Sequence, residues 1–227
     1  MTSQTAILYQ DDALVVAAKP SGLAVHRGWA AHEPTYAVDV VTALIGQRVH
    51  PAHRLDRATS GVLVFALDPA AAAALGAQFA AHSVAKVYLA LVRGVPPEAA
   101  VIDHPIANEP GEPGKDAVTA IRRLATIGRY SLVEARPASG RRHQIRRHLK
   151  HIACPLIGDV NYGKGEHNRL WRAEHGLHRL ALHAIRLDLD HPRTGARMTF
   201  RAPVPDDLAG PLLHAGFAPE LLEPERY

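Results

Sequence analysis

The sequence predicts an α+β fold with a mixed, largely antiparallel sheet flanked by helices and loops. Short apolar runs come first along the chain, and helical and strand-like segments follow without the regular strand–helix alternation that parallel sheets require. The chain has 227 residues, 47% of them hydrophobic, which is enough for one good-sized core. Because no linker divides the chain, we expect residues 1–227 to form a single domain.

The N-terminal third predicts a hairpin, two helices and a buried strand. Apolar runs at residues 6–9 and 14–18 flank Gln10–Asp12, a pattern typical of a β-hairpin. Residues 36–45 have apolar side chains at helical spacing, and residues 69–81 form an alanine-rich segment with Asp68 in the N-cap position. Between these two helices, GVLVFAL at residues 61–67 predicts a buried strand.

The rest of the chain predicts further strands around one basic helix. Residues 86–94, 130–135, 180–189 and 198–202 have strand-like patterns, and residues 108–116 form a polar loop rich in Gly and Pro. In RRHQIRRHLKHI at 141–152, Ile145, Leu149 and Ile152 follow the helical period. We therefore expect an amphipathic helix with a basic, exposed outer face.

Composition limits the classes of partner. The chain has 26 Lys and Arg, 22 Asp and Glu, a formal charge of +4 and a pI near 9.4, which is compatible with a polyanionic partner. Its one cysteine, Cys154, excludes an internal disulfide and a multi-cysteine zinc site. The sequence has no secretory leader and no run of 18 apolar residues, so we expect a cytoplasmic protein that does not bind membranes.

Residues 136–151 carry six Arg and Lys, three His and no acid. Such runs are usually solvated helix faces, but this one has no internal acidic partner, which favours phosphate binding. The spacing of His143, His148 and His151 matches no zinc motif, so we expect no metal. The Ser60–Gly61 pair lacks the upstream glycine of a serine-hydrolase elbow, and the glycines form no phosphate-binding loop.

Asp56 stands between two arginines in the segment AHRLDRATSG at residues 52–61. A lone aspartate in a loop is more often a turn residue or a surface ion pair than a catalyst. This loop leads directly into an apolar strand, so we expect it to be packed, and a packed carboxylate needs a partner because its desolvation is costly. A carboxylate held by an arginine stays ionised and can act as a nucleophile or a base.

Four segments, in this order, resemble the motifs of the RluA-type pseudouridine synthases. KPSG at 19–22 is similar to the first motif, HRLDRATSG at 53–61 to the signature, KVY at 86–88 to the tyrosine motif and GRRHQIRRH at 140–148 to the arginine motif. The likeness runs from about Ile7 to Phe217. It implies the pseudouridine synthase catalytic fold and the isomerisation of a uridine in RNA to pseudouridine.

The resemblance also implies roles for individual residues. Asp56 is expected to be the catalytic aspartate, as a nucleophile at the ribose or as a base, and Arg146 to pair with it. Tyr88 is expected to stack on the target base, Ile145 to line the pocket, and Arg54 to help extrude the nucleotide. The further residues expected to contact RNA are Arg57, Arg141, Arg142, His143, Arg147 and Lys150.

These residue types suit the chemistry that the resemblance implies. An isomerase needs neither water nor a second carboxylate, whereas an ordinary glycosidase has two carboxyl groups across the bond. We therefore expect no cofactor. A uridine inside a helical stack must be flipped out, and contacts of arginines with phosphates and of an aromatic ring with the base can offset the cost.

The expected substrate follows from the compact form of the chain. Because the first motif begins by Lys19, we expect no N-terminal RNA-binding domain, and we predict no obligatory protein partner. This form, together with Trp29 and the segment at residues 158–184, resembles the TruC type of the family, which modifies uridine 65 of tRNA. The alternatives are a compact rRNA synthase or one that modifies both tRNA and rRNA. A non-catalytic RNA-binding protein on the same scaffold is a further alternative, disfavoured because Asp56, Tyr88 and Arg146 are all present.

Overall fold

The computed structural model describes residues 4–28, 34–107, 109 and 111–227. Trp29 and two residues of the loop at 108–116, Asn108 and Pro110, lie outside the described residues. The strands are β1 (Ala6–Gln10), β2 (Leu14–Lys19), β3 (His50–Pro51), β4 (Ser60–Ala66), β5 (Ala85–Arg93), β6 (Ala99–Asp103), β7 (Val118–Ile127), β8 (Tyr130–Pro137), β9 (Leu182–Asp190) and β10 (Arg197–Arg201). The helices are α1 (Ala37–Ile45), α2 (Pro69–Ala80), α3 (Gln144–His151), α4 (Gly165–His175) and α5 (Asp206–His214), followed by 3₁₀ turns η1 (Pro219–Leu221) and η2 (Pro224–Arg226).

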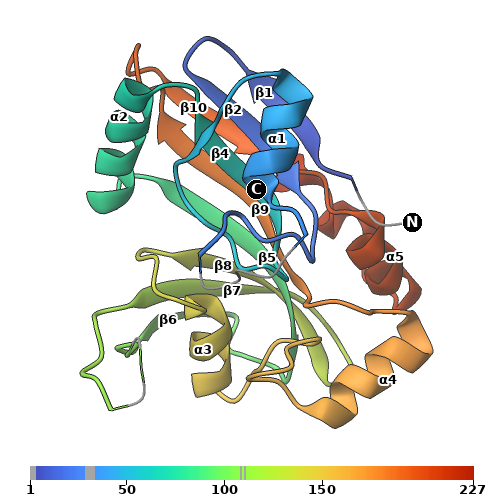
Figure 1. Ribbon diagram of the computed structural model, residues 1–227. Coiled ribbons are helices and arrows are strands. Elements are labelled where there is room, and N and C mark those ends of the chain that lie inside the picture. Colours follow the sequence, from blue (N-terminus) through green and yellow to red (C-terminus); the bar gives the residue numbers. More distant parts are fainter. Residues whose placement is uncertain (1–3, 29–33, 108, 110) are drawn as a thin grey trace.

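Within the described residues, the ten strands form one sheet in the order β1-β2-β4-β9-β5-β8-β7-β6, with β10 beside β9 and β3 beside β4 (Figure 1). The pairs of these strands are antiparallel, apart from the short parallel pairing of β4 with β9. The prediction of an α+β fold with a largely antiparallel sheet is therefore confirmed.

Two sets of helices cover opposite faces of this sheet. In β4, Val62 and Val64 pack with α2, whereas Leu63 and Phe65 pack with α1, because successive side chains of a strand point to opposite faces. In the other half of the sheet, α3 packs on β8 through Ile145 and Leu149. The helices α4 and α5 pack on the opposite face through residues that include Trp171, Leu208 and Leu212. Figure 1 shows α1 and α3 on the viewer's side of the sheet, with the loop before β4 between them.

Glycine is required where β4 meets β9. Gly61 has a φ of 121°, and a Cβ at this position would lie 2.2 Å from the carbonyl oxygen of Ala184. The parallel pairing joins Ser60 to His183 and Gly61 to Ala184, directly after the loop that carries Asp56. This close approach fixes the end of the loop against the centre of the sheet.

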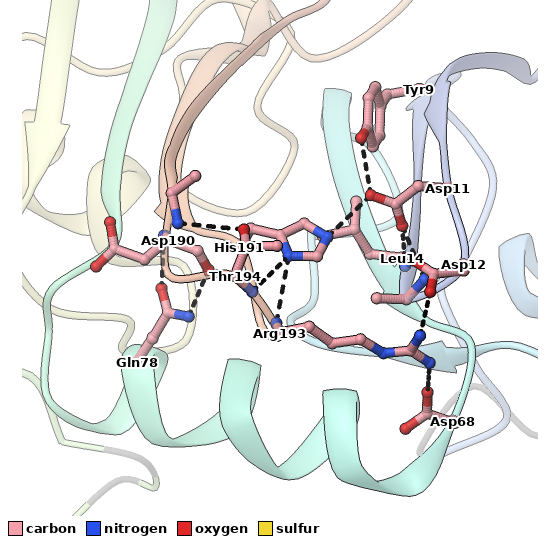
Figure 2. A network of polar contacts seen from close by, with 12 residues as sticks. Tyr9, Asp11, Asp12, Leu14, Asp68, Gln78, Asp190, His191, Arg193 and Thr194 are labelled. Carbon is pink, nitrogen blue, oxygen red and sulfur yellow. Dashed lines mark hydrogen bonds and ion pairs between the residues drawn. The ribbon is translucent and has the colours of Figure 1, made fainter.

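At one end of the strands, a polar network joins three connections: the β1–β2 turn, the start of α2 and the β9–β10 turn (Figure 2). His191 Nε2 lies 2.9 Å from Asp11 Oδ2, and Arg193 binds both Asp12 and Asp68. Asp68 also accepts a hydrogen bond from the backbone N–H of Ala71, so it caps α2 as predicted. The three connections are thereby held together, although they are far apart in the sequence.

The basic helix is shorter than the sequence predicted. It begins at Gln144, so Arg141 and Arg142 precede it instead of lying on its outer face. Of the residues expected on that face, Lys150 is exposed, whereas Arg147 is half-buried and donates a hydrogen bond to the carbonyl of Ala107. The prediction of one continuous exposed basic helix face over residues 141–152 is therefore wrong.

The basic run also finds acidic partners elsewhere in the chain. Arg136 pairs with Glu134 at 2.6 Å, and Arg142 lies 4.0 Å from Glu109. Arg146 pairs with two aspartates, which are described below with the site. The run contains no acid of its own, as the sequence shows, but these charges are paired with acids that lie elsewhere in the chain.

Candidate active site

Asp56 lies in the loop between β3 and β4, on the face of the sheet that α1 and α3 share. The buried side chain of Leu55 anchors the loop, and the N–H of Thr59 donates to the carbonyl of Asp56 at 3.0 Å, which closes a turn. The Asp56 side chain is 21% exposed, so its carboxylate reaches solvent from a packed loop. A carboxylate in this position can meet a ligand without first unfolding the loop.

The segment at 19–22 holds this loop in place. Lys19 is 2% exposed, and its ammonium donates to the carbonyls of Pro20, Leu23 and Arg57 at 2.8, 2.7 and 3.2 Å. Ser21 Oγ donates to the carbonyl of Ala58 at 2.8 Å. Burial, and then the positive charge of Arg179, lowers the pKa of Lys19 to about 7. The first motif therefore holds the backbone carbonyls of Arg57 and Ala58, the two residues that follow Asp56, a role that its sequence alone did not reveal.

Arg146 joins Asp56 to a second aspartate. Its Nη1 lies 3.2 Å from Asp56 Oδ2, as the resemblance implied, while Nε and Nη2 donate to the two oxygens of Asp159 at 2.7 and 2.9 Å. Burial alone would lower the pKa of Arg146, but the hydrogen bonds and negative charges of Asp159 and Asp56 outweigh this effect and raise it. The guanidinium is thus a fixed, permanently charged bridge between two carboxylates.

Asp159 was missed by the sequence reasoning. It is 1% exposed and also accepts hydrogen bonds from the backbone N–H groups of Asn161 and Tyr162. Burial would raise the pKa of its carboxyl, but the hydrogen bonds and charge of Arg146 outweigh burial and hold that pKa below its usual range. Nothing in the local sequence marks Asp159 as buried, because its partner arrives from a different element.

Tyr88 lies in β5, next to a bulge between Val87 and Tyr88 in the pairing with β9. It lines a cavity of about 640 Å³ together with Asp56 and Ile145. Burial, and then the charge of Asp56, raises the pKa of the Tyr88 hydroxyl, so this side chain stays neutral at physiological pH. An aromatic ring and a carboxylate therefore face one cavity of ligand size.

A second cavity, of about 500 Å³, adjoins the first. The residues that line both cavities are Arg54, Leu55, Asp56, Arg142, His143 and Arg146. Arg57 lines the second cavity, and Arg54, Arg57 and Arg142 are exposed. Asp56 and Arg146 consequently lie where two cavities meet, beside three exposed arginines that can contact an anionic ligand.

The other residues expected to contact RNA differ in their surroundings. Arg141 is half-buried, lines the larger cavity and donates to the carbonyl of Asp116 at 3.1 Å. Lys150 is exposed, with its Nζ 5.7 Å from the centre of the Tyr162 ring. His143 faces Asp56, with a side chain only 16% exposed. Arg147, which binds the loop at Ala107, lines neither cavity.

Within the described part of the chain, no group of three or more His, Cys, Asp or Glu side chains could hold a metal ion. His148 is instead buried between Thr119 and the carbonyl of His104, and His151 stacks on His104 with ring centres 3.8 Å apart. No helix among the described residues is both long and apolar enough to cross a membrane.

The profile of the RNA pseudouridylate synthase family matches residues 13–151, a span that contains Asp56, Tyr88 and Arg146. The chain belongs to this family, and it is an RNA pseudouridine synthase, as the four motifs predicted.

The similar proteins also indicate a subgroup. The tRNA pseudouridine synthase C of Vibrio cholerae is 40% identical over 95% of this chain and 98% of its own length. The protein of the same name from Haemophilus ducreyi is 42% identical over 86% of this chain and 89% of its own length. Among solved structures, human RNA pseudouridylate synthase domain containing 4 aligns with a TM-score of 0.77 and 29% identity over 92% of each chain.

Proposed function

We propose that this protein converts one uridine of a tRNA, at position 65, to pseudouridine, with Asp56 as the catalytic nucleophile or base. The observation that carries the proposal is the Asp56–Arg146 pair at the junction of two cavities, with Tyr88 lining the larger one. Similarity to proteins named tRNA pseudouridine synthase C, over nearly the full length of both chains, supports tRNA as the substrate.

The proposed division of labour follows from the charges and cavities. Arg146 holds the Asp56 carboxylate in a fixed orientation, because its other two nitrogens are already fixed on buried Asp159. The uracil enters the 640 Å³ cavity and stacks on Tyr88, beside Ile145. Arg54, Arg57 and Arg142 contact the phosphates around the flipped nucleotide. Arg54 also helps to extrude this nucleotide and occupies the space that it leaves in the stack.

The isomerisation balances without a cofactor. The C1′–N1 bond breaks, a C1′–C5 bond forms, one proton leaves C5 and one is added at N1. We further propose that one domain carries the whole site, that no obligatory protein partner takes part, and that the reaction occurs in the cytoplasm, where the tRNA is.

The first test is to map pseudouridine in total RNA from cells that lack the gene and from cells in which the gene is restored. The expected result is loss of one modification in tRNA and its return on complementation. Loss of a site in rRNA alone would contradict tRNA as the substrate, and loss at both RNAs would support a dual enzyme.

The second test is Asp56→Asn with an unmodified tRNA transcript. The amide keeps the size of the side chain but removes its charge, so it cannot attack C1′ or accept a proton. Pseudouridine should fall to background, while RNA affinity, which comes mostly from phosphate contacts, should persist. Product made by a well-folded Asp56→Asn protein would contradict the assigned role. If wild type made no pseudouridine in a tRNA transcript or in an rRNA transcript, a non-catalytic RNA-binding protein would be favoured.

A further inference from the structure

His143 occupies an unusual backbone position at the edge of the site. It precedes α3 with φ 55° and ψ 28°, in the left-handed region that residues other than glycine rarely adopt. Such a conformation is strained and persists only where the surrounding structure enforces it. An enforced, strained residue beside a catalytic carboxylate is a candidate for a functional role.

The next residue, Gln144, enforces this turn. Its side-chain oxygen accepts from Ser139 Oγ at 2.8 Å and from the Arg141 N–H at 3.0 Å. Its amide nitrogen donates to the carbonyl of Val118 at 2.9 Å and to Thr119 Oγ1 at 3.0 Å. Two of these four hydrogen bonds tie the turn to β7 and the other two join it to the loop that follows β8, so the His143 side chain is held over the site.

The imidazole of His143 lies between Asp56 and Tyr162. Its Nε2 is 3.8 Å from Asp56 Oδ2, and its Nδ1 is 3.1 Å from the Tyr162 hydroxyl. Tyr162 is itself positioned, because the guanidinium of Arg146 lies 5.1 Å from the centre of its ring. With Nδ1 bonded to Tyr162, Nε2 is the ring nitrogen that faces the carboxylate in the wall shared by both cavities.

The charged groups around His143 determine its protonation. Burial is the largest influence and lowers its pKa; the negative charges of Asp56 and Asp159 oppose this, and the positive charges of Arg146 and Arg142 add to it. The net result is a pKa below the ordinary value of 6.5, so the imidazole is neutral at pH 7 and can accept a proton.

The proposed reaction needs such an acceptor. After C1′ has bonded to C5, that carbon still carries its hydrogen, which must leave as a proton. As this bond forms, Asp56 is displaced from C1′ or returns its proton to the ribose, but its carboxylate stays paired with Arg146, and a neutral imidazole is in general a stronger base than a carboxylate. The C–H electron pair becomes the C5=C6 double bond, the electrons of C6=N1 move to N1, and N1 takes a proton from water.

We infer that His143 is a further catalytic residue: its Nδ1–H donates to the Tyr162 hydroxyl oxygen, which orients the ring and leaves the lone pair on Nε2 to remove the C5 proton. The inference rests on the proposed function. It gives His143 a role beyond the RNA contact that the resemblance implied. The imidazolium that forms is stabilised by the Asp56 carboxylate and loses its proton to water when the product leaves.

The test uses His143→Asn, because asparagine tolerates the left-handed conformation but cannot act as a base at neutral pH. We expect the single-turnover rate of pseudouridine formation to fall by about 10²- to 10⁴-fold, with an unchanged RNA dissociation constant. On a transcript with deuterium at C5 of the target uridine, the isotope effect on product formation should rise above that of wild type, because C–H cleavage becomes rate-limiting. The loss of rate in acid that protonation of His143 causes in wild type should be absent in the variant.

A second variant, His143→Gly, tests the chemistry without strain, since glycine suits this backbone conformation. Its rate should be restored at least tenfold by added imidazole, whereas His151→Asn, an exposed histidine of the same helix, should behave as wild type. An unchanged rate in His143→Asn, or a slow variant with no imidazole rescue and no altered isotope effect, would overturn the inference. Weaker RNA binding with a smaller salt slope and an unchanged rate would return His143 to a phosphate contact. If wild type itself made no pseudouridine, the proposed function would fail as well. Failure of the His143 inference alone is therefore recognised by an active wild-type enzyme.

Discussion

At the scale of single residues, the neighbours Arg146 and Arg147 have the same charge and opposite surroundings. Arg146 is 7% exposed and binds two aspartates, whereas Arg147 is half-buried and binds a backbone carbonyl. Side chains of adjacent helical residues point about 100° apart, so only one of the two can face Asp56. Their positions on α3 decide their roles, because their chemistry is identical.

We predict that Arg146→Ala lowers the turnover of saturating RNA far more than Arg147→Ala does. Removing Arg146 also leaves buried Asp159 unpaired, which should reduce the free energy of unfolding by about 3–5 kcal/mol. Arg146→Lys keeps the charge but loses the bidentate geometry, so it should retain partial activity. Single-turnover rates and thermal melts of the three variants provide the check, and equal loss in Arg146→Ala and Arg147→Ala would contradict the proposed role of the pair.

Asp159→Asn tests whether the second aspartate positions the first through Arg146. The amide can accept only one of the two charge-assisted bonds, so the guanidinium should lose its fixed orientation towards Asp56. We expect the single-turnover rate to fall by about 10²-fold, in line with small misplacements of catalytic groups, while the dissociation constant for tRNA stays within twofold. A variant that folds, binds RNA and reacts at the wild-type rate would show that Asp56 and Arg146 need no such support.

At the scale of elements, the strands were predicted best where every side chain is buried, because such a strand is a continuous apolar run in the sequence. β4 is buried along its whole length and shows as an apolar run. β7 was missed, because VTAIRRLATI has only two fully buried side chains, Thr119 and Ile121, and charges in its centre. α4 was missed because its buried side is limited to His167 and Trp171, and α5 because Gly210 and Pro211 interrupt its helical pattern.

The candidate site was predicted to the extent that its motifs resemble a known family. The resemblance placed Arg146 beside Asp56, although 90 residues separate them, and no spacing rule reaches across that distance. The resemblance did not reveal that Lys19 clamps the loop, nor that Asp159 holds Arg146 from the other side. These contacts depend on which elements the sheet brings together, which local sequence does not encode.

The exposed cations of the loops before β4 and α3 should set the salt dependence of RNA binding. Arg54, Arg57 and Arg142 line the cavities, and each phosphate contact contributes a slope of about 0.7–0.9 in log K against log salt. We predict that Arg142→Ala lowers the slope by about one unit or less, measured by titration between 50 and 200 mM salt. Arg197→Ala, at an exposed cation of β10 outside both cavities, is the matched control. Equal slopes for wild type and Arg142→Ala would exclude this arginine from the interface.

At the scale of the whole molecule, buried His183 links stability to pH. It is 1% exposed, lies 2.8 Å from Ser60 Oγ and contacts the carbonyl of Ala202 at 3.1 Å. Burial lowers its pKa to about 4. In the unfolded chain the pKa returns to about 6.5, so only the unfolded state takes up a proton as the pH falls from 6.5 towards 4.

We therefore predict that the free energy of unfolding decreases between pH 6.5 and 5, with up to about 1.4 kcal/mol per pH unit due to His183. His183→Asn should be less stable at pH 7 but should show a flatter decrease over this window. Urea denaturation at several pH values measures both effects, with His151→Asn as the control that keeps the wild-type slope. If His183→Asn kept that slope too, the decrease would have to come from other groups.

The place of β9 between β4 and β5 has a consequence for synthesis on the ribosome. The strands β1, β2 and β4 can pair locally as they emerge, and so can β5 to β8, but the two groups share no edge until residues 182–190 have been made. Such long-range closure is slow, since the intervening chain must be ordered before its contacts form. Asp56 belongs to the first group and Arg146 to the helix that packs on the second. The nascent chain therefore acquires its carboxylate–arginine pair only after about four-fifths of the polypeptide has left the tunnel, and until then it exposes two unfinished sheet edges to its surroundings.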